Sequence, residues 1–373
     1  MKKLLLMAAL LSPAIIYAQK KAPKTYDLLI GGYGSNIAVY RFYAETGKLA
    51  YLSQSDDIKN PSYLCVDKDS KFVYAVSEQG AASEVNAYTL DPKTGQLTIV
   101  NKQPVKGADA CYVSVDEDSK NLFVANYSSG SLTVLPLNED GSVLPLSQLI
   151  QEKGSSANKQ RQEGPHVHTA FLSPDEKYLL YTDLGTDKIH SYRYKSSQDQ
   201  PLTLTSITTV APGSGPRHLD FSPDKKHVYV LEELTGDVTV FDYDNGKLKQ
   251  VQTITMLAPG FKGKVGAADI HVSPDGRFVY ASNRGDINNI VVYSVAPETG
   301  LLTFVERKPT MGKTPRNFVI DPTGNYLLVA NQDSNSVFVF KLDKTTGKLR
   351  QMASYIQIDK PACLKFASAQ PQK

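Results

Sequence analysis

Hydrophobic and polar residues alternate with a period of two along most of the chain, in short stretches separated by turns rich in Gly, Pro, Asn and Asp. Examples are SLTVLPL from Ser131, DVTVFDY from Asp237 and SVFVFKL from Ser336. This alternation is typical of β-strands with one buried face, and the turn residues are typical of hairpins. Because no long segment shows the 3.6-residue period of an amphipathic helix, we predict an all-β chain.

A longer pattern recurs about every fifty residues. Each unit has an apolar stretch, a turn, and a second strongly β-forming stretch that ends in polar residues. The residues that lead the turn are Asp67, Asp116, Ser173, Ser222, Ser273 and Asp321. Successive positions differ by 49, 57, 49, 51 and 48 residues. The long step contains the polar segment 151–162, which we predict to be a surface loop insertion.

Each unit is long enough for four short antiparallel strands, which make one blade of a β-propeller. Six complete units are visible, and the chain ends supply the halves of a seventh. Residues 363–366 resemble a first strand, and residues 26–33 and 36–42 resemble the strands that follow it. We therefore predict a seven-bladed β-propeller in one domain, 19–373, with its last blade closed by N- and C-terminal strands. A solenoid of the same period would need capping repeats instead of complementary halves.

The segment 1–18 differs from the rest of the chain. Lys2 and Lys3 precede the apolar run 4–11, and the small residue Ala18 ends the segment. This order is typical of a secretory signal peptide, so we predict an exported protein, periplasmic or secreted. No other segment has the length of a membrane span, so no membrane association is predicted.

Charge and cysteine content argue against a nucleic-acid-binding protein and against a disulfide-stabilised one. The chain has 41 Lys and Arg against 38 Asp and Glu, which is too even for nucleic acid to be the main partner. Cys65, Cys111 and Cys363 are odd in number and lie in apolar, strand-like surroundings. We interpret them as buried hydrophobic residues and not as a disulfide framework.

The repeat also brings polar positions together. In a propeller the first strand of each blade is innermost, so the start of that strand and the end of the second strand meet at one mouth of the channel. The first-strand positions are Ser62, Cys111, His168, Arg217, Ala268 and Arg316. The second-strand positions are Ser77-Glu78, Asn126-Tyr127, Asp183-Leu184, Glu232-Glu233, Asn283-Arg284 and Asn331-Gln332. Such a varied polar set is typical of a binding or catalytic pocket, although Asn126, Asn283 and Asn331 are also suited to satisfying backbone groups at strand ends.

Histidine spacing and short motifs indicate neither a metal site nor a nucleotide cofactor. His166 and His168 in GPHVH have the spacing of a metal-binding pair, but no third ligand follows from local sequence, so we predict no metal. His218 follows Arg217 and is expected to face the neighbouring blade. No GxSxG, GxxxxGK[ST] or GxGxxG element is present, which disfavours a covalent serine mechanism and implies no nucleotide cofactor.

Four segments carry a resemblance to a known family. They are GPHVHTAFLSPD from Gly164, GPRHLDFSPDKKHVYVLEEL from Gly215, AADIHVSPDGRFVYASNRG from Ala267 and TPRNFVIDPTGNYLLVANQ from Thr314. Together they resemble the lactonase family of seven-bladed propellers, which includes bacterial 6-phosphogluconolactonases and fungal carboxy-muconate lactonizing enzymes. The resemblance implies a catalytic set of His168, Arg217, Glu233 and Arg284, with His166 as the second choice of histidine. The repeat adds expected substrate-binding residues: His166, Arg316, Asn126, Tyr127, Asp183, Glu78 and Gln332.

These residues suit the opening of an anionic sugar lactone by water. Arg217 and Arg284 can bind a carboxylate or phosphate, or stabilise an oxyanion, and either His168 or Glu233 can act as the base. Export leaves open whether the lactone is phosphorylated. A lactonizing cycloisomerase of carboxylated substrates and a non-catalytic exported propeller that binds ligands or proteins remain alternatives. The sequence does not indicate an oligomeric state.

Overall fold

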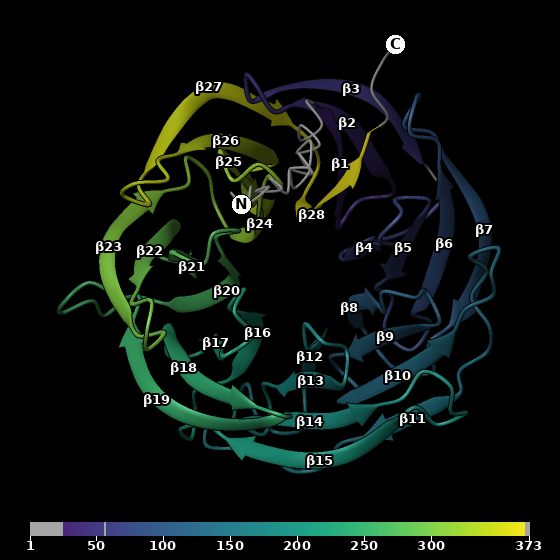
Figure 1. Ribbon diagram of the computed structural model, residues 1–373, viewed down its shortest axis with the longest axis horizontal. Coiled ribbons are helices and arrows are strands. Elements are labelled where there is room, and N and C mark those ends of the chain that lie inside the picture. Colours follow the sequence, from purple (N-terminus) through teal and green to yellow (C-terminus); the bar gives the residue numbers. More distant parts are fainter. Residues whose placement is uncertain (1–24, 56, 370–373) are drawn as a thin grey trace, which may run out of the picture.

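The described strands form seven four-stranded antiparallel sheets that stand around a common axis like the blades of a propeller (Figure 1). The structure is a computed structural model that describes residues 25–55 and 57–369. The segment 1–18, which the sequence predicts to be a signal peptide, lies outside the described residues. The predicted all-β fold with seven blades of four antiparallel strands is confirmed.

Each blade has one strand nearest to the axis and one at the outer rim (Figure 1). From the axis outward, blade 1 contains β28 (Pro361–Ser368), β1 (Thr25–Gly32), β2 (Ile37–Tyr43) and β3 (Lys48–Ser55). Blade 2 contains β4 (Leu64–Val66), β5 (Phe72–Ser77), β6 (Glu84–Leu90) and β7 (Leu97–Pro104). Blade 3 contains β8 (Ala110–Val115), β9 (Asn121–Asn126), β10 (Ser131–Pro136) and β11 (Gln148–Gln151). Blade 4 contains β12 (Val167–Leu172), β13 (Tyr178–Asp183), β14 (Lys188–Tyr194) and β15 (Leu202–Thr209).

The remaining three blades have the same order of strands. Blade 5 contains β16 (Pro216–Phe221), β17 (His227–Glu232), β18 (Asp237–Asp244) and β19 (Lys247–Thr255). Blade 6 contains β20 (Val265–Val272), β21 (Phe278–Gly285), β22 (Asn289–Val295) and β23 (Leu302–Pro309). Blade 7 contains β24 (Pro315–Ile320), β25 (Tyr326–Asn331), β26 (Ser336–Leu342) and β27 (Leu349–Gln357). The short 3₁₀ helix η1 (Gln332–Ser334) is the only helix in the described part of the chain.

Both ends of the described chain complete blade 1. Strand β28 pairs antiparallel with β1, which places Leu28 opposite Phe366 and Ile30 opposite Leu364. This pairing gives blade 1 the same four strands as the other blades and joins the first repeat to the last, which closes the ring. The prediction that N- and C-terminal strands close the last blade is confirmed.

Side chains that lead the hairpin turns explain why Asp or Ser recurs about every fifty residues. In blade 2, Oδ1 of Asp67 accepts hydrogen bonds from the backbone N–H groups of Lys71 and Phe72, both at 2.7 Å. In blade 5, Oγ of Ser222 accepts a hydrogen bond from the N–H of His227 at 2.9 Å. These bonds satisfy backbone donors that a tight turn leaves unpaired, and they fix the hairpin that carries the inner strand.

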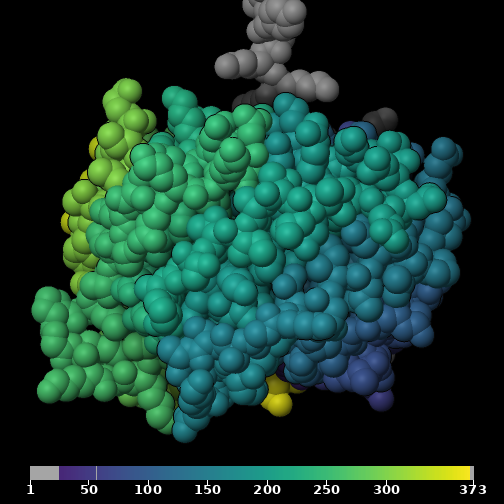
Figure 2. All heavy atoms as spheres, turned by 90° about the horizontal axis from the view of Figure 1, so that it is seen from below, coloured from purple at the N-terminus to yellow at the C-terminus, as the bar shows by residue number. Residues whose placement is uncertain are grey.

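Apolar side chains of the middle strands form the core between neighbouring blades. Val124 and Leu231, for example, are fully buried. Tyrosines join adjacent blades, as where the hydroxyl of Tyr229 in blade 5 donates to the carbonyl of Gly300 in blade 6 at 3.0 Å. The three cysteines are free and buried, as predicted. Seen from the side, consecutive blades form one continuous wall (Figure 2).

Among the described residues, no helix has the length and apolar character that crossing a membrane requires.

Candidate active site

The inner ends of the blades enclose a cavity of about 520 Å³. It lies on the side of the ring opposite to the hairpin turns that Asp67, Ser222 and their equivalents lead. The polar positions derived from the repeat supply eight of its lining residues: Glu78, Cys111, Tyr127, His168, Arg217, Glu233, Arg284 and Arg316. All four residues expected to be catalytic are in this group. Three of the expected substrate-binding residues, Glu78, Tyr127 and Arg316, are there as well.

The innermost strands are irregular where they reach the cavity. In β16 the pairing with β17 shifts between Pro216 and Leu219, so Arg217 and His218 have no regular partners. Shifts at the corresponding place occur in β8, β12, β20 and β24. A β-bulge adds unpaired residues to one strand and re-aims their side chains. The bulges therefore turn side chains of the inner strands toward the axis.

The bulge in β16 gives His218 more contacts than the sequence predicts. The expected contact with the neighbouring blade is present, because Nδ1 of His218 lies 2.7 Å from Oδ1 of Asp269 in β20 of blade 6. The His218 ring also packs edge-on against Tyr63 and Tyr112 from across the axis, with centroids 5.9 and 5.6 Å away, which the sequence does not predict. His218 therefore belongs to a buried polar layer beneath the cavity, and its ring centroid is 5.1 Å from that of His168.

The paired polar residues at the end of each second strand point in different directions, as successive residues of a strand do. Glu232 is 1% exposed, and neither of its carboxylate oxygens has a hydrogen-bond partner among the described residues. Burial raises the pKa of Glu232 to about 8. Glu233, the next residue, lines the cavity. The same change of direction separates buried Asn283 from Arg284.

Glu233 holds three arginines together. Its Oε2 lies 2.8 Å from Nε of Arg217 and 3.1 Å from Nη2 of Arg284, and its Oε1 accepts a hydrogen bond from Nη2 of Arg161 at 2.7 Å. Arg217 follows the start of β16 in blade 5, Arg284 lies in β21 of blade 6, and Arg161 comes from the loop between blades 3 and 4. One carboxylate thus joins side chains from three parts of the ring.

This cluster changes the protonation behaviour of its members. Burial opposes ionisation of Glu233, but the charges of Arg284, Arg217 and Arg161 outweigh burial and lower its pKa to about 2. Burial lowers the pKa of Arg284 to about 9, with Glu233 acting against that shift. Near neutral pH, Glu233 is therefore a fixed anion and a poor proton acceptor.

His168 lies beside the cluster and remains neutral. Its side chain is 4% exposed, and its ring stands edge-on to Tyr127 with centroids 5.8 Å apart. Nδ1 is enclosed and has no hydrogen-bond partner among the described residues, so the ring meets the cavity through its other edge. Burial, and then the charge of Arg217, hold the pKa of His168 well below its usual value of 6.5.

A second cationic group lies in the same cavity. The guanidinium of Arg316 lies 5.2 Å from the centre of the Tyr33 ring, within the range of a cation–π contact. The Tyr33 hydroxyl donates to Oε2 of Glu78 at 3.0 Å, and burial raises the pKa of Tyr33 to about 12. Tyr33 follows the second strand of blade 1, so it occupies the repeat position that Glu78 occupies in blade 2.

Four of the expected substrate-binding residues do not line the cavity: His166, Asn126, Asp183 and Gln332. His166 stacks on the Tyr127 ring at 4.3 Å, and its Nδ1 lies 3.0 Å from the Tyr127 carbonyl oxygen. Because Tyr127 contacts both His166 and His168, the two imidazoles are held apart by its ring. Asn126 instead donates to Thr133 at 3.0 Å within its own sheet.

Asp183 and Gln332 also form hydrogen bonds with nearby parts of the chain. The carboxylate of Asp183 accepts hydrogen bonds from the N–H groups of His166 at 2.7 Å and Gly185 at 3.0 Å, and from the Thr186 hydroxyl at 2.6 Å. Gln332 begins η1, and its N–H donates to the carbonyl of Thr314 at 2.9 Å. Asp183 therefore shapes the backbone that leads to the cavity.

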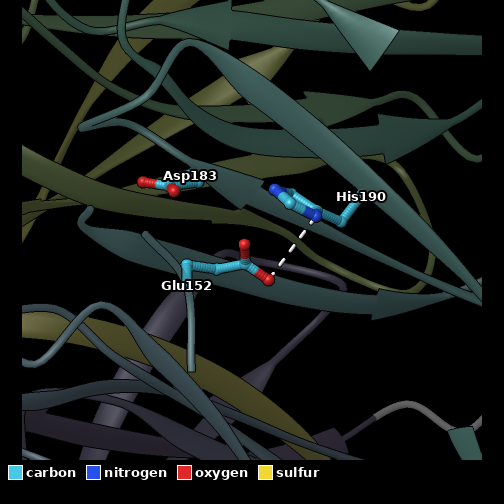
Figure 3. Close-up of side chains that lie close together, drawn as sticks. All are labelled: Glu152, Asp183 and His190. Atoms are coloured by element: carbon cyan, nitrogen blue, oxygen red, sulfur yellow. Dashed lines mark ion pairs between the residues drawn. The ribbon is translucent and has the colours of Figure 1, made fainter. Parts of the chain in front are cut away.

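One group of side chains offers the ligand atoms that a cation would require. Glu152, Asp183 and His190 each contribute an atom, and these atoms lie within 4.8 Å of one another (Figure 3). Nδ1 of His190 is 3.5 Å from Oε1 of Glu152, and its ring stacks on Tyr181 at 4.7 Å. None of the three lines the cavity. An ion held there would bind the first residue of the loop that begins at Glu152, and it would not contact a substrate in the cavity.

Nothing in the sequence indicates that Arg161 belongs to the site. Arg161 lies in the segment 151–162, for which the sequence predicts only a surface loop, and no repeat position corresponds to it. Tyr33 could have been identified, since it directly follows the second strand of blade 1. Lys264, which also lines the cavity, precedes the inner strand of blade 6 and carried no motif.

Comparison with known proteins agrees with this architecture. A sequence model of the family described as "Lactonase, 7-bladed beta-propeller" matches residues 27–366. The chain belongs to the lactonase family. A family member called 6-phosphogluconolactonase in Bacillus subtilis is 36% identical over 339 residues, which cover 89% of this chain and 95% of that protein. One of the same name in Formosa agariphila is 34% identical over 338 residues, 89% of this chain and 96% of that protein.

Solved structures of similar proteins show the same ring. A candidate 6-phosphogluconolactonase from Bacteroides fragilis is 40% identical, with a TM-score of 0.89 over 94% of this chain and all of that one. The periplasmic gluconolactonase PpgL from Pseudomonas aeruginosa is 38% identical, with a TM-score of 0.88 over 93% of this chain and all of that one. The resemblance seen in the four sequence segments is thereby confirmed.

Proposed function

We propose that this protein is a lactonase, a carboxylic-ester hydrolase that opens a sugar lactone of the 6-phosphogluconolactone type in the cavity around Glu233. Membership of the lactonase family and the names of its relatives support this activity. The observation that carries the proposal is the position of neutral His168 in the same cavity as the arginines gathered by Glu233. A base beside fixed cations is what addition of water to an ester carbonyl requires.

The charge of the cavity supports an anionic substrate. Five cationic side chains line it against two carboxylates: Arg161, Arg217, Lys264, Arg284 and Arg316, with Glu78 and Glu233. The cavity therefore has a surplus of three positive charges, while the whole chain of 373 residues carries only +3. Such a local excess attracts an anion and holds it by charge-assisted hydrogen bonds.

His168 is the better general base of the two candidates. Glu233 is bound by three guanidinium groups, and its pKa of about 2 leaves it with little affinity for a proton. The ring of His168 is neutral and has a free edge at the cavity. An anionic substrate would offset the arginine charges that lower the pKa of His168, so binding would make this base stronger.

The reaction then follows from these roles. His168 takes a proton from water as the water oxygen bonds to the lactone carbonyl carbon. Arg284 and Arg217 stabilise the oxyanion that forms, while Glu233 holds their guanidinium groups in place. The intermediate collapses by breaking the bond to the ring oxygen, which receives the proton from protonated His168. The product is the open hydroxy acid, and His168 is again neutral.

The location of the reaction follows from the N-terminal segment. We infer from Lys2, Lys3 and the apolar run 4–11 that the protein is exported. The periplasmic gluconolactonase of Pseudomonas aeruginosa, at 38% identity, supports an exported member of this architecture. A non-phosphorylated gluconolactone is therefore tested beside the phosphorylated one.

Acid release from 6-phosphogluconolactone and from gluconolactone tests the proposal, with spontaneous hydrolysis subtracted. We expect the wild type to hydrolyse at least one of them and Arg284→Ala to be about 10²- to 10³-fold slower. Arg193→Ala, on the exposed face of β14, is the matched control and should keep the wild-type rate. The proposal fails if the wild type opens neither lactone faster than water does.

A further inference from the structure

The loop that carries Arg161 is built onto the ring by buried hydrogen bonds. The carboxylate of Asp187, which is 1% exposed, accepts hydrogen bonds from the Ser156 hydroxyl and from Nε2 of Gln162 at 2.8 Å. The Gln162 amide, itself fully buried, also donates to the carbonyl of Leu184 at 2.8 Å. The loop is thereby fixed on both sides of Arg161.

Asp187 connects this loop to the strand that carries Arg217. The same carboxylate accepts hydrogen bonds from the N–H groups of Gly213 and Gly215, both at 2.7 Å. Gly215 lies two residues before Arg217, and its carbonyl accepts a hydrogen bond from the N–H of Glu233 at 2.7 Å. One buried acid therefore sets the position of Arg161 relative to Arg217 and Glu233.

Arg161 differs from the other two arginines of the cluster. Arg217 and Arg284 are 2% and 15% exposed, and both donate to backbone carbonyls of blade 6 as well as facing Glu233. Arg161 is 43% exposed. Its partners in the described structure, Glu233 and the Tyr127 hydroxyl, both contact Nη2, which leaves Nε and Nη1 without partners there.

We propose that Arg161 is the binding residue for the anionic substituent that the substrate carries away from its lactone ring, a phosphate monoester or a second carboxylate. The Nη2 atom stays with Glu233, and the free donors of the same guanidinium meet the entering anion. Arginine is suited to this task because its planar group offers five donors in a fixed geometry. The inference rests on the proposed function, since it assigns part of the same cavity to one end of the substrate.

The position of Arg161 explains how one cluster can serve two ends of a substrate. Arg217 and Arg284 are held by blade 6 and are nearly enclosed, and the proposed reaction assigns them to the ring carbonyl. Arg161 is presented from a separate loop on the exposed side of Glu233. A substrate anion bound there would be placed at a set distance from the reacting carbonyl by Glu233.

Calorimetric titration with ring-opened sugar acids tests this assignment without requiring turnover. The ligands are 6-phosphogluconate, the dicarboxylate glucarate and the monocarboxylate gluconate. The variants are Arg161→Gln, Arg161→Lys and, as a matched control, Lys159→Gln, an exposed lysine of the same loop. Thermal unfolding of each variant confirms that the loop substitutions leave the ring folded.

We expect the wild type to bind an acid with a second anionic group more tightly than gluconate. Arg161→Gln should weaken that binding by about 10- to 100-fold and leave gluconate binding unchanged. Arg161→Lys should lose less, and Lys159→Gln should behave as the wild type. Comparison of 6-phosphogluconate with glucarate distinguishes a phosphate from a carboxylate as the preferred group.

Three results would overturn the assignment: no preference for a second anionic group, no effect of Arg161→Gln, or an equal loss for all three ligands. The last would mean that Arg161 acts only by holding Glu233. Failure of the proposed function would be recognised separately, because the wild type would then bind these acids in an Arg161-dependent way without hydrolysing any lactone.

Discussion

Nε of Arg217 lies 2.8 Å from Oε2 of Glu233, and both residues belong to one hairpin of blade 5, since Arg217 lies in β16 and Glu233 directly follows β17. This blade therefore supplies the centre of the site by itself. The neighbours on either side add Arg284 from blade 6 and Arg161 from the loop that precedes blade 4. The site is thus assembled by the order of blades in the ring and not by one continuous motif.

Replacing the central carboxylate should damage both stability and activity. In Glu233→Gln, three guanidinium groups lose their shared counter-charge in a largely buried place. We expect the free energy of unfolding to fall by about 2–5 kcal/mol and lactone hydrolysis to fall at least about 100-fold. Chemical denaturation and initial rates measure the two effects. The adjacent Glu232→Gln should retain the wild-type rate, and equal loss in both variants would contradict the role of Glu233.

The pH dependence of the reaction should follow the protonation of the His168 ring. Only the neutral ring can accept a proton, and its pKa lies well below 6.5 in the folded protein. Activity should therefore persist below pH 6.5 and fall only as His168 becomes protonated at still lower pH. The measurement is kcat/KM against pH, corrected for spontaneous hydrolysis.

Two variants test whether the acid limb of the pH profile belongs to His168. His168→Asn should lower kcat by about 10²- to 10⁴-fold and abolish the acid limb. His227→Asn, on the opposite side of the ring, should leave the profile unchanged. Full activity of His168→Asn would exclude His168 as the base, and a wild-type acid limb centred at or above pH 6.5 would contradict the lowered pKa of His168.

The repeat alone was sufficient to predict the fold and most of the site. Strand period, turn residues and complementary ends fixed the seven blades, and equivalent repeat positions identified His168, Arg217, Glu233 and Arg284 as neighbours. Inner-strand bulges could not be read from the sequence, because they change side-chain direction without a change in composition. This is why the contacts of His218 with Tyr63 and Tyr112 across the axis could not be predicted.

Arg161 could not be predicted for a different reason. It lies in an insertion that has no counterpart in the other repeats. The spacing of the repeats therefore cannot predict the direction of its side chain. Its position depends on tertiary hydrogen bonds between Asp187, Ser156 and Gln162. Asp183 shows the reverse case, since it occupies a repeat position next to the cavity but uses its carboxylate to bind backbone N–H groups.

Glu232 should make the protein less stable as the pH rises. Its folded-state pKa of about 8 exceeds the usual 4.5, so an unfolded chain releases this proton at lower pH than the folded protein does. The stability that depends on the protonated form is complete below pH 4.5 and is lost as the pH rises through 8. Glu232→Gln removes this loss.

Melting temperatures at pH 5 and pH 8 test this prediction. Between pH 5 and pH 8, the wild type should lose about 1–3 kcal/mol more of its free energy of unfolding than Glu232→Gln does. Glu298→Gln, at an exposed turn of blade 6, is the control and should show no such gain. A Glu232→Gln variant with the same pH dependence as the wild type would contradict the buried, protonated state of this carboxyl group.

The three cysteines should be unreactive in the folded protein. Cys65, Cys111 and Cys363 are buried, and burial raises the pKa of each thiol. A thiol reagent should label none of them in the native state and all three after denaturation, without prior reduction. Labelling of fewer than three in the denatured protein would reveal a disulfide that the described structure does not contain.

The most direct test of the central claim is a crystal structure of the protein with 6-phosphogluconate, the product expected from the phosphorylated lactone. We predict that the new carboxylate lies within hydrogen-bond distance of Arg217 or Arg284, near His168, and that the phosphate contacts Arg161. An acid bound with both anionic groups away from Arg217 and Arg284 would contradict the account.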